Sequence, residues 1–183
     1  MACWRISALA ACLLIASISP SLANLVIDPG FESCPTSPPP PGWSGTGFCN
    51  SGFPHTGSFA AGLENTSTLS QSIPTTSGGT YDFSFWVSGF NLGTPDQFTA
   101  SFGSDQVLDL VNVTPTTYTF EDFTVSATTA STIIAFAGTL SGDGTWLFDD
   151  VSVTAVAAVP EPPTLGLLAV TALGLVALYR RRA

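Results

Sequence analysis

The 183-residue sequence predicts an all-β protein in which an antiparallel β-sandwich lies between two apolar terminal segments. Three observations lead to this fold class. Apolar and polar residues alternate with a period of two, most clearly over residues 81–88. Turn-forming glycine, serine and proline residues separate the alternating stretches at short intervals. Between residues 24 and 158 no stretch has the periodicity of an amphipathic helix.

The alternating stretches define eight or nine short strands, and their number and spacing favour a jelly roll within the sandwich class. In residues 118–127 the alternation changes phase at Glu121 and Asp122, which is typical of a β-bulge. The predicted strands are 24–27, 58–63, 68–73, 80–90, 97–102, 105–112, 118–127, 131–138 and 145–156. Residues 24–158 therefore form one β-sandwich domain of ordinary size.

Residues 1–23 are predicted to be a signal helix of the secretory type. Arg5 supplies its positive charge, residues 6–18 form its apolar part, and Ser21 to Ala23 end it with a small-x-small sequence. We place the cleavage by signal peptidase of the export machinery after Ala23, so that the mature chain begins at Asn24. An uncleaved membrane anchor is the alternative.

Residues 159–183 have three parts in a fixed order. A proline-rich joint at 159–164 precedes a single apolar transmembrane helix at 165–179, and the basic end is 180–183. The apolar run is short for a bilayer core of about 30 Å, but arginine side chains at its end can extend to the headgroups. A buried core helix is the alternative, and the lack of a polar face disfavours it. The joint begins with Val159, Pro160, Glu161 and Pro162, and the membrane stop is Arg180, Arg181 and Arg182.

This tripartite tail resembles the PEP-CTERM sorting signal of exopolysaccharide-producing Gram-negative bacteria. The resemblance implies recognition by an exosortase, an integral-membrane cysteine protease that cleaves near the motif. It also implies export and an inner-membrane anchor before processing. The processed protein would then lie in the cell envelope or the extracellular matrix.

The charge of the exported domain is entirely negative. All four basic residues lie outside residues 24–158, and of the thirteen acidic residues only Glu161 does, which leaves twelve carboxylates. Nucleic-acid binding is excluded because it needs cations to replace the counterions of phosphates. Phosphate, nucleotide and anionic-lipid binding are disfavoured for the same reason. The composition suits solubility, neutral polysaccharides or divalent cations.

Two cysteines remain once the signal peptide is removed. Cys34 and Cys49 flank a proline-rich loop, and exported compartments permit disulfides. A bridge between them would stabilise the fold by about 3 kcal/mol. Two free thiols are the alternative.

Several short strings resemble the galactose-binding-like jelly rolls of carbohydrate-binding modules. They are the opening residues 24–32, Trp43, residues 58–61 and the closing residues 148–153. The resemblance implies that the first loop and the last strand lie together and often share a structural calcium ion. Calcium prefers six to eight oxygen ligands. The candidate ligands are Asp28, Glu32, Asp149 and Asp150, and the alternative is that these carboxylates are simply solvated.

The aromatic residues suggest sugar binding, since an aromatic ring stacks on the apolar face of a pyranose. Trp86 carries the most weight because it lies opposite the apolar face of its strand. The candidates are Trp43, Phe53, Trp86 and Trp146. His55 is the only histidine, and no sequence context marks a serine as its catalytic partner.

The sequence therefore predicts an exported, exosortase-processed envelope or matrix protein that is not an enzyme and binds glycans. A purely structural or adhesive protein is the first alternative. A small glycoside hydrolase is the second, because twelve carboxylates allow a chance pair at catalytic separation.

Overall fold

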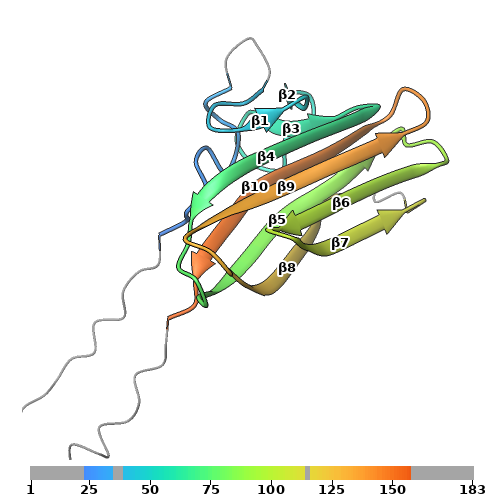
Figure 1. The fold of residues 1–183 in the computed structure, drawn as a ribbon. Coiled ribbons are helices and arrows are strands. Elements are labelled where there is room, and N and C mark those ends of the chain that lie inside the picture. The colour runs from blue at the N-terminus through green and yellow to red at the C-terminus, as the bar shows by residue number, and fades with distance from the viewer. Residues whose placement is uncertain (1–22, 35–38, 114–115, 158–183) are drawn as a thin grey trace, which may run out of the picture.

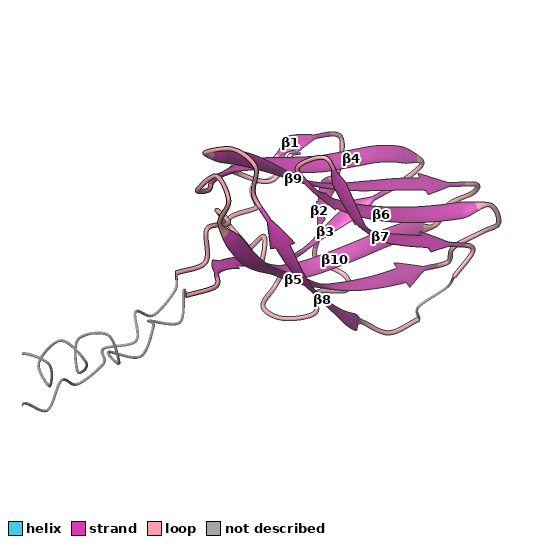
Figure 2. Cartoon of the chain, turned by 60° about the horizontal axis from the view of Figure 1, so that its bottom comes forward, coloured by secondary structure: helices cyan, strands magenta, loops and turns pink. Residues whose placement is uncertain are grey.

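The computed structural model describes residues 23–34, 39–113 and 116–157, which form two antiparallel sheets of five strands each (Figure 1). The strand order is β1-β4-β9-β6-β7 in one sheet and β2-β3-β10-β5-β8 in the other. Figure 2 shows the two sheets packed face to face. The strands are β1 Ser44–Gly45, β2 Phe48–Asn50, β3 Ala60–Leu63, β4 Thr66–Pro74, β5 Thr80–Phe90, β6 Asp96–Phe102, β7 Asp105–Val111, β8 Thr119–Ser126, β9 Ser131–Leu140 and β10 Thr145–Ala155.

The all-β sandwich is confirmed, and β3 to β10 coincide with eight of the predicted strands. The prediction of a strand at 24–27 is wrong. This segment runs beside the end of β10 and makes one backbone hydrogen bond, from Leu25 N to Val153 O, at 2.9 Å. The strands β1 and β2 were not predicted, because two or three residues are too few to show an alternation.

The predicted bulge at Glu121 and Asp122 is also wrong. Strand β8 pairs with β5 in unbroken register from Ser126 opposite Thr80 to Thr119 opposite Val87. Glu121 therefore takes an inward position in line with Phe123, and burial raises the pKa of its carboxyl. The irregular positions lie elsewhere, between Ala100 and Ser101 in β6 and between Asp149 and Ser152 in β10.

Aromatic rings from both sheets fill the space between them. Phe136 of β9 stacks on Phe148 of β10 with ring centroids 4.2 Å apart. Phe85 of β5 meets Phe136 edge-on at 5.0 Å. Full burial of one such side chain contributes about 1.5–3 kcal/mol, so these rings supply much of the stability of the sandwich. The largest fully buried side chains are Trp146, Phe31, Phe83, Phe85, Phe98, Phe136 and Phe148.

The chain enters and leaves the sandwich at the same end (Figure 1). Leu25 bonds to Val153 near the end of β10, and Val156 N donates to Thr80 O at the start of β5, at 2.8 Å. The predicted signal segment, except Ala23, and the predicted sorting tail lie outside the described residues. Within the described ranges there is no helix that could cross a membrane.

The predicted disulfide between Cys34 and Cys49 is present, with a Cα–Cα distance of 6.1 Å. It ties the first loop of the domain to β2. The loop at 51–59, which follows β2, is thereby fixed at its start.

Candidate functional site

An aromatic cluster covers part of the outer face of the β2-β3-β10-β5-β8 sheet. Trp86 of β5 and Phe120 of β8 are cross-strand partners, with ring centroids 5.2 Å apart. The Trp86 ring points outward, because its neighbours along β5, Phe85 and Val87, are buried in the core. Phe120 lies on the same face as its cross-strand partner Trp86. The imidazole of His55, from the 51–59 loop, stacks on Trp86 with a centroid distance of 4.1 Å and an interplanar angle of 19°.

The cluster continues toward the end of β5. Phe53 stacks on Phe90 at 4.7 Å, and Tyr118 donates its hydroxyl hydrogen to Phe53 O at 2.7 Å. Tyr118 also contacts the ring of His55 at a centroid distance of 5.1 Å. The aromatic cluster thus consists of Phe53, His55, Trp86, Phe90, Tyr118 and Phe120.

Part of the cluster is open to solvent. Phe53, Phe90 and Phe120 are each about half exposed, at 49%, 49% and 50%. Beside Phe53 and Phe90 lies an open pocket of about 260 Å³, with Tyr118 and Leu147 in its lining. This volume is slightly below the ~300–1,000 Å³ of typical small-molecule pockets. It suits one ring of a longer ligand rather than a whole oligomer.

Carboxylates of the last strand hold the His55 loop in place. Asp149 Oδ2 accepts hydrogen bonds from the backbone N–H groups of His55 and Thr56, at 2.9 and 3.2 Å. Asp150 Oδ1 accepts from Thr56 Oγ1 at 2.7 Å, and Asp150 Oδ2 lies 2.7 Å from His55 Nδ1. These contacts fix the orientation of the imidazole over Trp86.

Burial and charge shape the electrostatics beneath the cluster. Burial raises the pKa of Asp149 to about 6, although three backbone N–H groups donate to its carboxylate and oppose the rise. Burial, followed by the negative charges of Asp149 and Asp150, also raises the pKa of Tyr118. The field of both carboxylates therefore reaches the aromatic rings.

The predicted calcium ligands lie where the first loop meets the last strand. A Cβ atom on Gly30 would lie 3.6 Å from Asp150 Oδ1 and 3.8 Å from both Asp149 Oδ1 and Glu32 Cγ. Glu32 Oε1 accepts from the backbone N–H groups of residues 58 and 59, and Asp28 Oδ1 accepts from that of residue 33. Asp28 Oδ2 is buried without a hydrogen-bond partner.

This arrangement does not by itself form a metal site. Among the described residues no three His, Cys, Asp or Glu side chains converge in a metal-binding group. Most of the carboxylate oxygens already accept hydrogen bonds, so an ion would need backbone carbonyls or a side-chain rearrangement. Calcium binding by these carboxylates stays a prediction.

Of the four predicted sugar-binding rings, Phe53 and Trp86 belong to the aromatic cluster. The prediction is wrong for Trp43 and Trp146, which are 4% and 0% exposed and belong to the core. Trp43 packs against Phe31 with a centroid distance of 5.3 Å. Neither indole offers a face to a ligand.

Four members of the cluster were not predicted from the sequence. The predicted bulge obscured the regular alternation that places Phe120 on the outer face. His55, Phe90 and Tyr118 lie in or beside loops, where no periodicity shows which way a ring points. The only sequence feature that could have indicated their place in the cluster is that they lie in or beside loops that contain other aromatic residues.

His55 and Asp150 form a hydrogen-bonded pair of the kind found in catalytic triads. Among the described residues, no serine, threonine or cysteine side chain is hydrogen-bonded to the His55 ring. The pair therefore lacks a positioned nucleophile in this part of the chain, and its observed contacts are those of a residue that fixes a loop.

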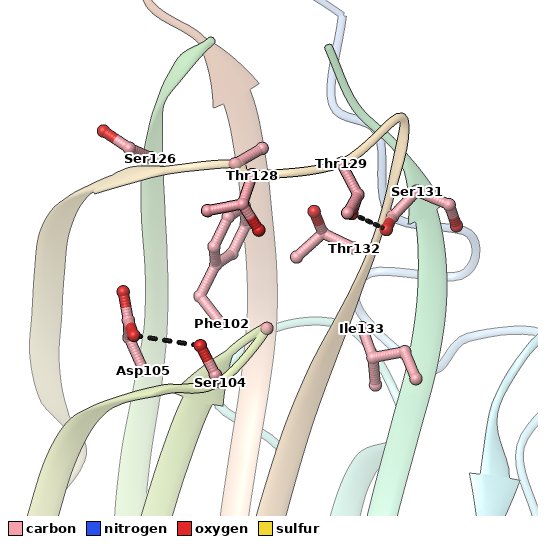
Figure 3. A pocket seen from close by; sticks show the side chains of 11 residues that line it. Phe102, Ser104, Asp105, Ser126, Thr128, Thr129, Ser131, Thr132 and Ile133 are labelled. Carbon is pink, nitrogen blue, oxygen red and sulfur yellow. Dashed lines mark hydrogen bonds between the residues drawn. The ribbon is translucent and has the colours of Figure 1, made fainter. Parts of the chain in front are cut away.

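A second pocket, of about 300 Å³, opens at the end of the sandwich where the chain enters and leaves (Figure 3). It lies between the β6–β7 and β8–β9 turns. Ser104 Oγ donates to Asp105 Oδ1 at 3.2 Å, and Thr129 Oγ1 donates to Ser131 O at 2.6 Å. These hydroxyls stabilise the turns. The ring of Phe102 at its base is buried, so the pocket offers no aromatic face for stacking.

The fold is a jelly-roll sandwich similar to those of solved carbohydrate-binding modules. A family 61 carbohydrate-binding module, solved in complex with β-1,4-galactotriose, superposes with a TM-score of 0.56 and 16% identity over 73% of this chain and 99% of that one. The xylan-binding first family 22 module of Xyn10C from Paenibacillus barcinonensis superposes with a TM-score of 0.53 and 16% identity. The match covers 71% of this chain and 93% of that one. These identities show the fold alone.

The fold also occurs in an enzyme. A cyclase from Fischerella sp. TAU, in complex with 4-(1H-indol-3-yl)butan-2-one, gives a TM-score of 0.52 and 16% identity over 75% of this chain and 99% of that one. The architecture is thus compatible with both binding and catalysis. No curated protein sequence matches this chain significantly.

The C-terminal tail has a similarity of its own. Residues 158–182 match the PEP-CTERM protein-sorting motif. The chain is thus an exported protein with a C-terminal membrane-anchoring sorting signal.

Proposed function

We propose that the protein is a non-enzymatic component of the cell envelope or extracellular matrix, released or transferred by an exosortase, whose aromatic cluster binds a polysaccharide without acidic groups. Neutral polysaccharides are included in this class. The sorting motif at 158–182 supports the processing step. The observation that supports glycan binding most directly is the set of half-exposed rings Phe53, Phe90 and Phe120 around Trp86 on one face of a sheet.

The chemistry of the surface fits such a ligand. Aromatic rings stack on the C–H face of a pyranose, and the nearby hydroxyl and carboxylate groups accept hydrogen bonds from sugar hydroxyls. Residues 24–158 contain no lysine or arginine. A uronic-acid polymer would therefore meet only negative charge at this surface.

A glycan array of the exported protein tests this function, with and without calcium. We expect binding to weaken about three- to tenfold in Phe120→Ala, which removes an exposed ring of the cluster. Ile133→Ala is the matched control, because Ile133 is equally exposed but belongs to the other sheet.

Three outcomes separate the candidate functions. Binding that is weakened in Phe120→Ala and unchanged in Ile133→Ala supports the proposal. An array without any ligand would favour the purely structural or adhesive protein. Release of reducing sugar from a bound glycan would instead favour the small glycoside hydrolase.

A further inference from the structure

Beside the aromatic cluster, the same sheet face carries carboxylates. Phe120, Asp122 and Thr124 share the outward side of β8, and Asp122 lies opposite Ser84 in β5. Asp82 lies opposite Thr124 in the next outward row. Residues two apart on a strand are separated by about 6.6 Å. A substituent on a sugar ring that stacks over Phe120 would therefore reach the Asp122 carboxylate.

The Asp122 carboxylate is available to a ligand. The side chain is exposed, and it is hydrogen-bonded to no other side chain or backbone group in the described ranges. Asp82, also exposed, accepts only a long hydrogen bond of 3.4 Å from Thr124 Oγ1. No structural contact thus accounts for the Asp122 carboxylate beside the rings.

Negative charge also lies on the other side of Trp86. Asp149 is the cross-strand partner of Trp86 in β10, and Asp150 follows it. The exported domain has no lysine or arginine to offset these charges. An ammonium group near the cluster would be attracted by carboxylates on both sides and by the exposed face of the Phe120 ring.

We propose that the polysaccharide bound at the aromatic cluster is a polymer of amino sugars that carries free amino groups. A sugar ring stacks on the half-exposed ring of Phe120 while its ammonium pairs with the carboxylate of Asp122. This inference rests on the proposed glycan-binding function and narrows its ligand class. N-acetylation removes the positive charge, so the site distinguishes the free amine from its acetylated form.

Calorimetry of the exported protein with three hexamers tests the inference. The probes are β-1,4-linked hexamers of glucosamine, N-acetylglucosamine and glucose, at a pH at which the amine is protonated. We expect the glucosamine hexamer to bind at least about tenfold more tightly than the other two, because several carboxylates contribute at a surface of high dielectric constant.

Two isosteric variants separate a specific contact from general attraction by a negatively charged protein. Asp122→Asn should weaken binding of the glucosamine hexamer about fivefold. Asp105→Asn removes the same charge from an exposed position on the other sheet and should have almost no effect. Equal losses in the two variants would overturn the inference, since only the net charge would then matter.

The remaining outcomes distinguish the inference from the function on which it rests. Equal affinities for the three hexamers, all weakened by Phe120→Ala, would overturn the amino-sugar inference and leave glycan binding intact. The same conclusion holds if no hexamer binds but the array finds another glycan whose binding depends on Phe120. If the array finds no ligand at all, glycan binding and the inference are both wrong.

Discussion

The buried carboxylate of Asp149 should make the stability of the sandwich depend on pH. Its side chain is fully buried, and burial raises its pKa from 3.8 to about 6. The folded protein therefore binds a proton at this site more readily than the unfolded chain. The free energy of unfolding must rise as the pH falls through about 6 toward 3.8.

The magnitude follows from the size of this pKa shift. A rise of roughly two pH units corresponds to about 3 kcal/mol when the full range is crossed. Between pH 7 and pH 5 the gain in unfolding free energy is roughly 1 kcal/mol for this one group. Burial also raises the pKa values of Asp96 and Glu121, and the other carboxylates repel one another less on acidification, so a variant is needed to isolate Asp149.

Asp149→Asn provides that isolation. In this variant the amide oxygen can still accept hydrogen bonds from the backbone N–H groups of His55 and Thr56. The amide nitrogen replaces Oδ1, which in the parent protein accepts a hydrogen bond from Asp150 N, and this bond is lost. The lost hydrogen bond changes the stability by a constant amount of about 1 kcal/mol, and the pH dependence of Asp149 disappears.

Urea denaturation at pH 5, 6 and 7, followed by tryptophan fluorescence, measures the effect. We expect the gain in unfolding free energy from pH 7 to pH 5 to be smaller by roughly 1 kcal/mol in Asp149→Asn than in the parent protein. Asp105→Asn removes an exposed carboxylate and should keep the slope of the parent. Identical slopes for the parent and Asp149→Asn would refute the assignment of a raised pKa to this buried group.

Three further predictions concern processing, calcium and the disulfide. Mass spectrometry of the mature envelope protein should find its N-terminus at Asn24 and no residues beyond Pro160–Pro162, whereas an intact full-length chain would contradict sorting. Millimolar calcium should raise the melting temperature more than sodium chloride of equal ionic strength, because binding adds about 2.7 kcal/mol to the free energy of unfolding at a hundredfold excess over the dissociation constant. Glu32→Gln should abolish the difference, and equal shifts in the parent protein would exclude a specific site. Cys34→Ser should lower the free energy of unfolding by about 3 kcal/mol in urea titrations, and a variant as stable as the parent would show that the bridge does not stabilise the fold.

The long strands could be predicted because each has one face in the core, so that apolar and polar residues alternate along it. Strand β10 is an exception, because part of it is buried on both faces. It lies between β3 and β5, and the 51–59 loop contacts its outer face through Asp149. Residues 145–149 are consequently buried whichever way they point, so alternation could not place Trp146.

The aromatic cluster was predictable only in part for a related reason. Trp86 was identified because its strand has a clear apolar face opposite to it. His55 and Trp86 are brought together by carboxylates at the other end of the chain, and no local pattern encodes that contact. Sites assembled from loops and a distant strand depend on the tertiary fold itself.

Both chain ends of the sandwich domain lie at the same end of it, so one end of the domain is the attached end and the other is distant from the attachment. Strand β5 begins with Thr80, which bonds to Val156, and ends with Phe90, about 33 Å away at 3.3 Å per residue. Val156 is two residues before the sorting motif that begins at residue 158. While the tail is still anchored, the Phe53 and Phe90 pocket thus lies at the pole farthest from the point of attachment. An anchored protein would therefore hold this pocket away from its membrane attachment, open to a ligand before any cleavage takes place.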